Sequence, residues 1–193
     1  MKTDGLQNNT LRERLVWEGI NELNEVGYER FSLRHVAERC KVSCAAPYRH
    51  FSDKDELIAA IMDYVSQQWM SCANHEAEIP DRSTRDRLVA ISMAYIRFLR
   101  ANPKFRAIIM QSSTSKVKQM NLSMVSLSAV SQEMINRYCE EVRMPREIRD
   151  RKVFVIRSLI YGAALMLDNG EIQDDEETLN MIKQTLDREF DLP

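Results

Sequence analysis

Apolar positions in the N-terminal part of the chain recur roughly every three or four residues, the spacing of one face of an α-helix. The first run ends at Gly27, a natural helix stop, and a second helix is expected after Ser32, which can cap a helix N-terminus. A short turn leads to a third helix, expected from Ser43 to near Phe51, and a fourth follows directly. The side chains expected to be buried in these helices are Leu15, Val16, Ile20, Leu23, Leu33, Val36, Ala37, Cys40, Leu57, Ile58, Ile61, Val65 and Trp69.

Prolines divide the rest of the chain into further helical segments, with breaks at Pro80, Pro103 and Pro145. The expected helices cover residues 88–98, a short stretch from 103, residues 117–138, residues 147–168 and residues 179–190. The pattern therefore predicts an all-α fold of about nine helices with no strand.

Composition supports this interpretation. Hydrophobic residues make up 44% of the chain and charged residues 29%, the balance of a globular protein rather than a disordered one. Glycine and proline number five each, fewer than the turns of a sheet protein normally use. No apolar run approaches the roughly 18 residues that a membrane-spanning helix needs, so no membrane partner is expected.

Residues 1–10 are polar and lack the apolar stretch of a secretory signal peptide, so we interpret them as a mobile tail, with an arm that touches DNA as the alternative. Without such a signal, the four cysteines indicate a cytoplasmic protein with free thiols. Cys40 and Cys44 lie near His35 and His50 in the sequence, but zinc sites usually pair two C-x2-C motifs. We therefore expect neither a metal nor another cofactor.

Charge is distributed unevenly, although the formal net charge is −2. Residues 27–54 hold six basic and three acidic side chains, whereas residues 168–177 hold six acidic ones and no basic one. The acidic stretch is interpreted as a solvated loop. The basic stretch indicates contacts with nucleic-acid phosphates.

The most specific motif lies in the basic stretch and reads Val42-Ser43-x-Ala45-Ala46-x-Tyr48-x-His50-Phe51-x-x-Lys54-x-x-Leu57. Together with the Gly27-Tyr28 pair, it resembles the DNA-binding signature of the TetR family of bacterial transcriptional regulators. The resemblance implies a three-helix domain with a helix-turn-helix over residues 1–53, and an effector-binding and dimerisation domain over residues 54–193. The C-terminal part fits the family only in its order of helices.

The motif also suits a helix-turn-helix on physical grounds, since the second helix of such a unit enters the major groove. Small residues are needed where its two helices cross, and Ala37 and Ala45 supply them. Apolar anchors hold it on its supporting helices: Val36, Val42, Phe51 and Leu57. Two residues depart from the family pattern. Lys41 stands where the turn often has glycine, and Pro47 leaves the carbonyl of Ser43 without its N–H donor, which tightens or kinks the helix.

The predicted DNA contacts fall into three groups. Tyr48, His50 and Lys54 are placed to reach phosphates, with the N-terminus of the fourth helix adding a favourable dipole. Arg34 and Arg49 are the candidates for reading guanine edges. The other candidates are small side chains that allow a close approach: Ser32, Ser43, Cys44, Ala45 and Ala46. Packing for Tyr48 and His50, and solvation for Arg49, are the alternative interpretations.

The C-terminal half contains no glycine-rich phosphate loop, no G-x-S-x-G and no H-E-x-x-H motif. It does carry methionine and aromatic residues on helices expected to face one another. These residues are either ordinary core or together the lining of a pocket for an apolar effector, which in the family lies between the fourth and eighth helices. The candidates are Met62, Trp69, Met93, Tyr95, Phe98, Met110, Met120, Met124, Tyr161 and Met166.

The helix over residues 147–168 is apolar almost all round, and the last helix presents a second apolar stripe. Two such helices from each of two chains form the four-helix interface of TetR dimers. The residues expected there are Val153, Ile156, Leu159, Ile160, Ala163, Leu167, Leu179, Ile182 and Leu186. If these helices packed only within the chain, the protein would be a monomer.

The sequence therefore predicts a homodimeric, non-enzymatic regulator: a repressor released from a double-stranded DNA operator by a small, largely apolar molecule. An activator, or a helical DNA-binding protein regulated by a protein partner without a small effector, is the alternative. An enzyme is disfavoured because no paired carboxylates or metal-spaced His/Glu set appears. A purely structural adaptor would show no sequence-selective DNA binding.

Overall fold

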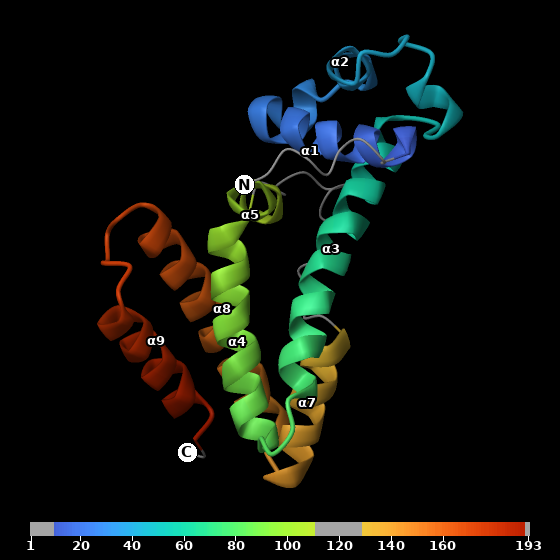
Figure 1. Ribbon diagram of the computed structural model, residues 1–193. Coiled ribbons are helices and arrows are strands. Elements are labelled where there is room, and N and C mark those ends of the chain that lie inside the picture. Colours follow the sequence, from blue (N-terminus) through green and yellow to red (C-terminus); the bar gives the residue numbers. More distant parts are fainter. Residues whose placement is uncertain (1–9, 111–128, 192–193) are drawn as a thin grey trace. The chain divides into compact units, whose positions relative to one another are not determined.

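The computed structural model describes residues 10–110 and 129–191, with residues 107–110 and 129 described by their backbone alone. These residues form helices joined by turns and contain no strand (Figure 1). In chain order the elements are α1 (Leu11–Arg30), α2 (Leu33–Arg39), the 3₁₀ helix η2 (Pro47–Arg49), α3 (Lys54–Glu78), α4 (Thr84–Ala101), α5 (Pro103–Met110), α7 (Ala129–Glu141), α8 (Arg146–Asp168) and α9 (Glu176–Glu189). The predicted all-α fold is confirmed. None of the described helices is long and apolar enough to cross a membrane.

The contacts divide the described residues into two compact units. The first contains residues 10–67 and 104–110, and the second contains residues 68–103 and 129–191. The division falls within α3, whereas the sequence suggested a domain boundary after residue 53. The first turns of α3 belong to the first unit because Leu57, Ile58 and Ile61 are buried in its core.

In the first unit, local signals set the limits of α1. Thr10 and Glu13 form a capping box, in which the Thr10 hydroxyl accepts from the Glu13 N–H at 3.3 Å and the Glu13 carboxylate accepts from the Thr10 N–H at 2.8 Å. The regular helix is interrupted at Gly27, where φ is 70°, a left-handed conformation that glycine adopts without steric cost. The predicted stop at Gly27 is therefore present.

The core of the first unit is formed by the apolar faces of α1, α2 and the beginning of α3. Its largest fully buried side chains are Leu15, Ile20, Val36, Phe51, Leu57, Ile58, Ile61 and Val65. The ring of Tyr64 on α3 makes edge-to-face contacts with Trp17 on α1 and Phe105 on α5, with centroids 6.5 and 6.2 Å apart. These contacts hold the helices that support the N-terminal helix-turn-helix.

In the second unit, α4 packs against α7, α8 and α9. The C-terminal end of α9 is held by polar groups from α4 and α7. The guanidinium of Arg85 donates to the carboxylate of Asp187 at 2.6 Å and to its carbonyl at 2.7 Å, and the hydroxyl of Tyr138 donates to the carbonyl of Phe190. Cations near the C-terminus of a helix satisfy its free carbonyls and interact favourably with its dipole.

Candidate nucleic-acid interface

The helix α2 forms the first half of the helix-turn-helix. Ser32 caps it, with its hydroxyl accepting from the N–H of Arg34 at 3.2 Å. At the other end, the N–H groups of Lys41 and Val42 donate to the carbonyls of Glu38 and Ala37 at 3.0 Å each, the two bonds of a Schellman motif. Lys41 has a φ of 56°, so it adopts the conformation that favours glycine, at a cost of about 1 kcal/mol.

The second half differs from the sequence expectation. The predicted α-helix from Ser43 to Phe51 is wrong, because the stretch folds as tight turns around the 3₁₀ helix η2. Pro47 has no N–H to donate to the Ser43 carbonyl, which accepts from the N–H of Ala46 at 2.9 Å instead. The next two bonds also span three residues, from Arg49 to Ala46 at 3.2 Å and from His50 to Pro47 at 2.9 Å, and the N–H of Phe51 then donates to the Pro47 carbonyl at 2.9 Å, four residues back. We call residues 43–50 the recognition segment.

The recognition segment presents most of the predicted DNA contacts to solvent. The exposed side chains are Ser43, Cys44, Ala45, Tyr48, Arg49 and His50. Tyr48 is 60% exposed, so its hydroxyl is accessible to a phosphate. Ala46 is half-buried. Ala45 was predicted at the crossing of two helices but is exposed, because the segment turns at Pro47 rather than continuing as a helix; Ala37 is buried as expected.

The cation of Lys54 lies at the N-terminus of α3, where it contacts Tyr28. Its Nζ is 4.4 Å from the centroid of the Tyr28 ring and 3.4 Å from the Tyr28 carbonyl oxygen. The hydroxyl of Tyr28 donates to Asp55 at 2.8 Å, and this hydrogen bond raises the pKa of Tyr28. Asp53 caps α3 by accepting from the N–H of Glu56 at 2.9 Å. Lys54 is therefore held beside a helix N-terminus, where a phosphate would also be stabilised.

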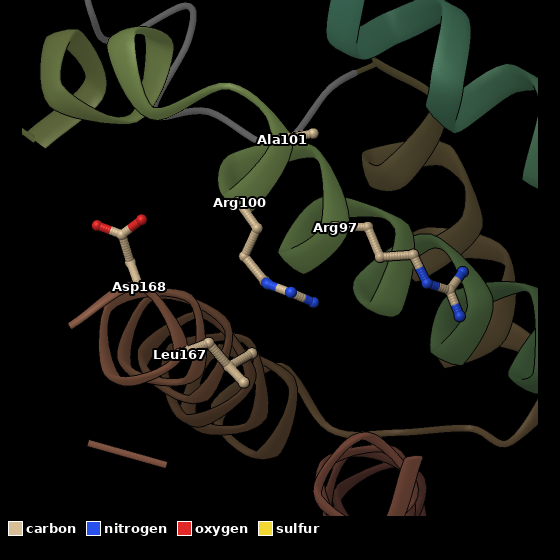
Figure 2. A pocket seen from close by; sticks show the side chains of 5 residues that line it. All are labelled: Arg97, Arg100, Ala101, Leu167 and Asp168. Carbon is tan, nitrogen blue, oxygen red and sulfur yellow. The ribbon is translucent and has the colours of Figure 1, made fainter. Parts of the chain in front are cut away.

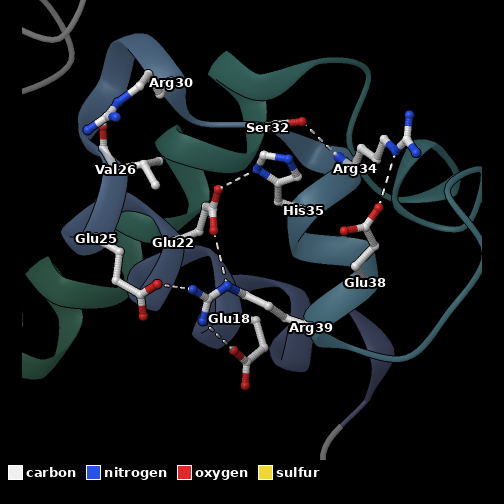
Figure 3. Close-up of polar contacts among 10 residues, drawn as sticks. All are labelled: Glu18, Glu22, Glu25, Val26, Arg30, Ser32, Arg34, His35, Glu38 and Arg39. Atoms are coloured by element: carbon white, nitrogen blue, oxygen red, sulfur yellow. Dashed lines mark hydrogen bonds and ion pairs between the residues drawn. The ribbon is translucent and has the colours of Figure 1, made fainter.

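An ion network joins α1 to α2 (Figure 3). Glu22 of α1 is only 3% exposed, with one carboxylate oxygen 2.9 Å from Nδ1 of His35 and the other accepting from Nε of Arg39 at 3.0 Å. Arg39 also pairs with Glu25, and lies 4.0 Å from Glu18. Glu22 was not among the residues predicted from the sequence. The signal was present, since it follows Gly19 by three residues and lies on the apolar stripe of the first helix.

Residues 18–61, which include α2 and the recognition segment, match the family model of the bacterial regulatory proteins of the tetR family. The helix-turn-helix region of the chain is therefore of the tetR type. A curated relative, the HTH-type transcriptional regulator BetI of Burkholderia thailandensis, is 32% identical over 84 residues. That match spans 43% of this chain and 43% of the relative, so it covers less than half of either protein.

The TetR fold extends over nearly the whole chain. A putative tetR family transcription regulator from Shewanella sp. PV-4 aligns with a TM-score of 0.74 and 15% identity, covering 93% of this chain and 97% of the other. The fatty acid degradation regulator FadR from Bacillus halodurans aligns with a TM-score of 0.69 and 12% identity, covering 91% and 97%. At the level of the family, TetR proteins are DNA-binding transcription regulators and not enzymes.

In the second unit of this TetR fold, four of the predicted pocket residues form one aromatic cluster. The ring of Tyr95 on α4 lies 4.5 Å from that of Trp69 on α3, 6.3 Å from that of Phe98 and 6.1 Å from that of Tyr161 on α8. The hydroxyls of Tyr95 and Tyr161 are 3.5 Å apart. Burial raises the pKa of Tyr95 strongly, and the neighbouring Tyr161 adds to the effect.

The other pocket candidates are methionines and are not among the rings of this cluster. Met93 is buried and Met166 is 38% exposed. Met62 is buried in the first unit, whereas the cluster belongs to the second. The side chains of Met110, Met120 and Met124 lie outside the described residues. The full lining of an effector pocket stays a prediction.

A hollow of about 410 Å³ lies between the C-terminal ends of α4 and α8, lined by Arg97, Arg100, Ala101, Leu167 and Asp168 (Figure 2). None of the predicted pocket residues lines it. Arg100 forms an ion pair with Asp174 in the loop that follows α8. Since cations compensate the dipole at a helix C-terminus, the two arginines suit a structural role at this position.

Six of the nine residues predicted for a dimer interface are buried within the chain itself: Ile156, Ile160, Ala163, Leu167, Ile182 and Leu186. Val153, Leu159 and Leu179 are half-buried. The large apolar side chains that α8 and α9 do expose were not among the nine predicted residues. Their exposed fractions are 71% for Phe154, 42% for Leu165, 38% for Met166 and 54% for Met181. Because α8 is apolar almost all round, the sequence pattern alone could not tell which stripe faces the chain's own core.

The cysteines differ in their surroundings. Cys40 is buried, and burial raises the pKa of its thiol, whereas Cys44 on the recognition segment is exposed. Within residues 10–110 and 129–191, no group of three or more His, Cys, Asp or Glu side chains is arranged to hold a metal ion.

Proposed function

We propose that this chain is a homodimeric, effector-responsive transcriptional repressor that binds a short pseudo-palindromic DNA operator in the cytoplasm. The proposal rests on the recognition segment. This segment exposes Tyr48, Arg49 and His50 and follows directly after the Schellman turn that ends α2. This segment lies inside the stretch that matches the tetR family. In a dimer, two such segments would enter successive major grooves about 34–36 Å apart.

The proposed roles follow from the chemistry of the exposed groups. Tyr48 and His50 would donate to phosphates, and Arg49 would read a guanine edge through its two parallel N–H donors. Arg34 is exposed but paired with Glu38 at 3.2 Å, so it would exchange this partner for DNA. An exposed i,i+4 pair of this kind contributes only about 0.3–0.5 kcal/mol, so the exchange costs little.

The effector would bind in the second unit, beside the aromatic cluster. Four rings that carry only two hydroxyls suit a small molecule that is largely apolar with one polar group. The structural neighbour from Bacillus halodurans is named as a regulator of fatty acid degradation, which agrees with an apolar effector for this fold. Such a molecule would release the operator if it bound the DNA-free conformation more tightly.

The proposed dimer interface uses the exposed stripe of α8. Phe154, Ser158 and Leu165 recur at i, i+4 and i+11, and therefore share one side of the helix. Gly162 lies near the same stripe, and a Cβ built on it would meet no described atom within 4 Å beyond its chain neighbours and the backbone of its own helix. Phe154 is 71% exposed in the single chain, and contact of such a large apolar side chain with water is unfavourable. We therefore expect a helix of the partner chain to cover it.

The DNA-binding proposal is tested by selecting genomic fragments with the purified full chain and measuring affinity for the best fragment by fluorescence anisotropy. Binding that exceeds a scrambled duplex by about a thousandfold supports a specific regulator. Equal affinity for the selected and scrambled DNA would contradict it. A promoter–reporter assay with the selected fragment then distinguishes a repressor from an activator.

The dimer is tested separately by analytical ultracentrifugation of the wild type, Phe154→Glu and the control Gln184→Glu. Gln184 is an exposed polar residue on α9. Phe154→Glu should sediment as a monomer at concentrations where wild type and control sediment as dimers, because a charge would be buried without a partner. A Phe154→Glu protein that remains dimeric would place the interface elsewhere.

A further inference from the structure

The contact between α1 and α2 contains a carboxylate that is almost fully buried. Glu22 is 3% exposed, and a charge in such a position is costly unless its oxygens are paired. Both oxygens are paired here, one with Nδ1 of His35 at 2.9 Å and the other with Nε of Arg39 at 3.0 Å (Figure 3). Since His35 and Arg39 lie one helical turn apart, one carboxylate fixes two successive turns of α2.

The guanidinium of Arg39 is directed entirely toward α1. Its Nε donates to Glu22, its Nη2 pairs with Glu25 and its Nη1 lies 4.0 Å from Glu18. These three carboxylates stand at i, i+4 and i+7 on one face of α1, as Figure 3 shows. Arg39 is therefore engaged within the protein and would not be available to a DNA phosphate.

The C-terminal end of α2 leads directly into the recognition segment. Nη2 of Arg14 on α1 donates to the carbonyl of Cys40 at 2.6 Å, which ties this end of α2 to α1 as well. The Schellman turn at Lys41 and Val42 follows, and the recognition segment begins at the next residue. A rotation of α2 about its axis would therefore displace the recognition segment.

We infer that Glu22 is a positioning residue for DNA binding, which acts through Arg39 and His35 to set the orientation of α2 and hence of the recognition segment. The inference rests on the proposed DNA-binding function and assigns to Glu22 a role that requires no contact with DNA. It also explains why a charged residue occupies a buried position of α1. An apolar side chain there would need no hydrogen-bonding partner.

The test compares operator binding by wild type, Glu22→Gln and the control Glu133→Gln. Glu22→Gln keeps the shape and removes the charge, so the operator Kd should rise about tenfold. Glu133 is exposed on α7, outside the Arg39 network, so Glu133→Gln makes the same chemical change and should stay within about twofold of wild type. Circular dichroism and thermal unfolding would check that each variant is folded at the assay temperature.

A second variant tests the histidine contact. His35→Ala removes the partner of one Glu22 oxygen, so the operator Kd should rise about three- to tenfold in this variant too. A merely structural role for Glu22 would lower the unfolding temperature of Glu22→Gln without changing the operator Kd, and that result would overturn the inference. Wild type that shows no sequence preference would instead overturn the proposed function, and the inference with it.

Discussion

Gly19 of α1 lies directly against Ile61 of α3, so that a Cβ built on Gly19 would be 2.8 Å from Cδ1 of Ile61. The two helices therefore approach closely at a position where α1 has no side chain. The atom nearest to this Cβ is the far end of the flexible Ile61 side chain, which can move by a few tenths of an ångström. The next atoms, at 3.5 and 3.6 Å, belong to Ile61 and Leu57 and leave little further space.

This approach predicts different outcomes for small and large substitutions. Gly19→Ala should change the free energy of unfolding by less than about 1 kcal/mol, because the helix propensity of alanine offsets the displacement of Ile61. Gly19→Leu should lower it by about 2–3 kcal/mol, because it overpacks the core of the first unit. Urea unfolding followed by circular dichroism measures both values. A Gly19→Leu protein as stable as wild type would show that α1 and α3 do not pack in this way.

Tyr48→Phe tests the phosphate contact proposed for the recognition segment. The hydroxyl is exposed, so its loss should leave thermal stability unchanged while operator affinity falls about three- to tenfold. Tyr28→Phe is the matched control, since that hydroxyl donates to Asp55 within the protein. It should affect stability more than affinity. If Tyr48→Phe binds the operator like wild type, the phenol ring rather than its hydroxyl makes the contact.

The role of Lys54 can be read from the salt dependence of binding. Its Nζ lies over the ring of Tyr28 at the N-terminus of α3, within reach of a phosphate placed there. If Lys54 neutralises one phosphate per chain, Lys54→Gln should reduce the slope of log K against log salt by about 1 for each chain bound. Anisotropy titrations at several salt concentrations measure this slope. An unchanged slope with weaker binding would indicate that Lys54 only supports Tyr28.

Alkaline pH should destabilise the protein through Tyr95. Because burial raises the pKa of Tyr95 above its ordinary value near 10, the folded state keeps a proton that the unfolded chain loses. The contribution to stability is therefore complete below about pH 10 and is lost above it, at about 1.4 kcal/mol per pH unit. Tyr95→Phe should show a shallower loss in urea unfolding between about pH 9.5 and 11. The other tyrosines are present in both proteins, so equal slopes would refute the assignment to Tyr95.

The sequence predicted the fold where the signals are local. N-cap side chains such as Ser32 and Asp53, and the stop at Gly27, act within one turn of helix and are readable without knowledge of tertiary contacts. The missing donor of Pro47 was also readable. Whether it kinks an α-helix or replaces it by a 3₁₀ turn depends on how the buried proline packs, and this is a tertiary property.

Two other features, the ion network of Glu22 and the buried face of α8, could not be predicted because they depend on contacts between residues far apart in the sequence. The partners of Glu22 lie 13 and 17 residues further along the chain, so only the fold shows that His35 and Arg39 meet it. On α8, the stripe that contains Ile156 and Ile160 is buried while Phe154 is exposed, although all three are large and apolar. Periodicity predicts that α8 has apolar stripes. Which of them is buried is determined by packing against α4.

The shortness of η2 has a consequence for how operators would be told apart. A 3₁₀ helix rises about 2.0 Å per residue, so Pro47–Arg49 advances only about 6 Å. Base pairs stack about 3.4 Å apart, so one such turn runs alongside fewer than two of them. Each chain of the proposed dimer would then sample few base edges, and much of the discrimination would come from the separation of the two half-sites. The length of the spacer between the half-sites would then be the most informative part of the operator.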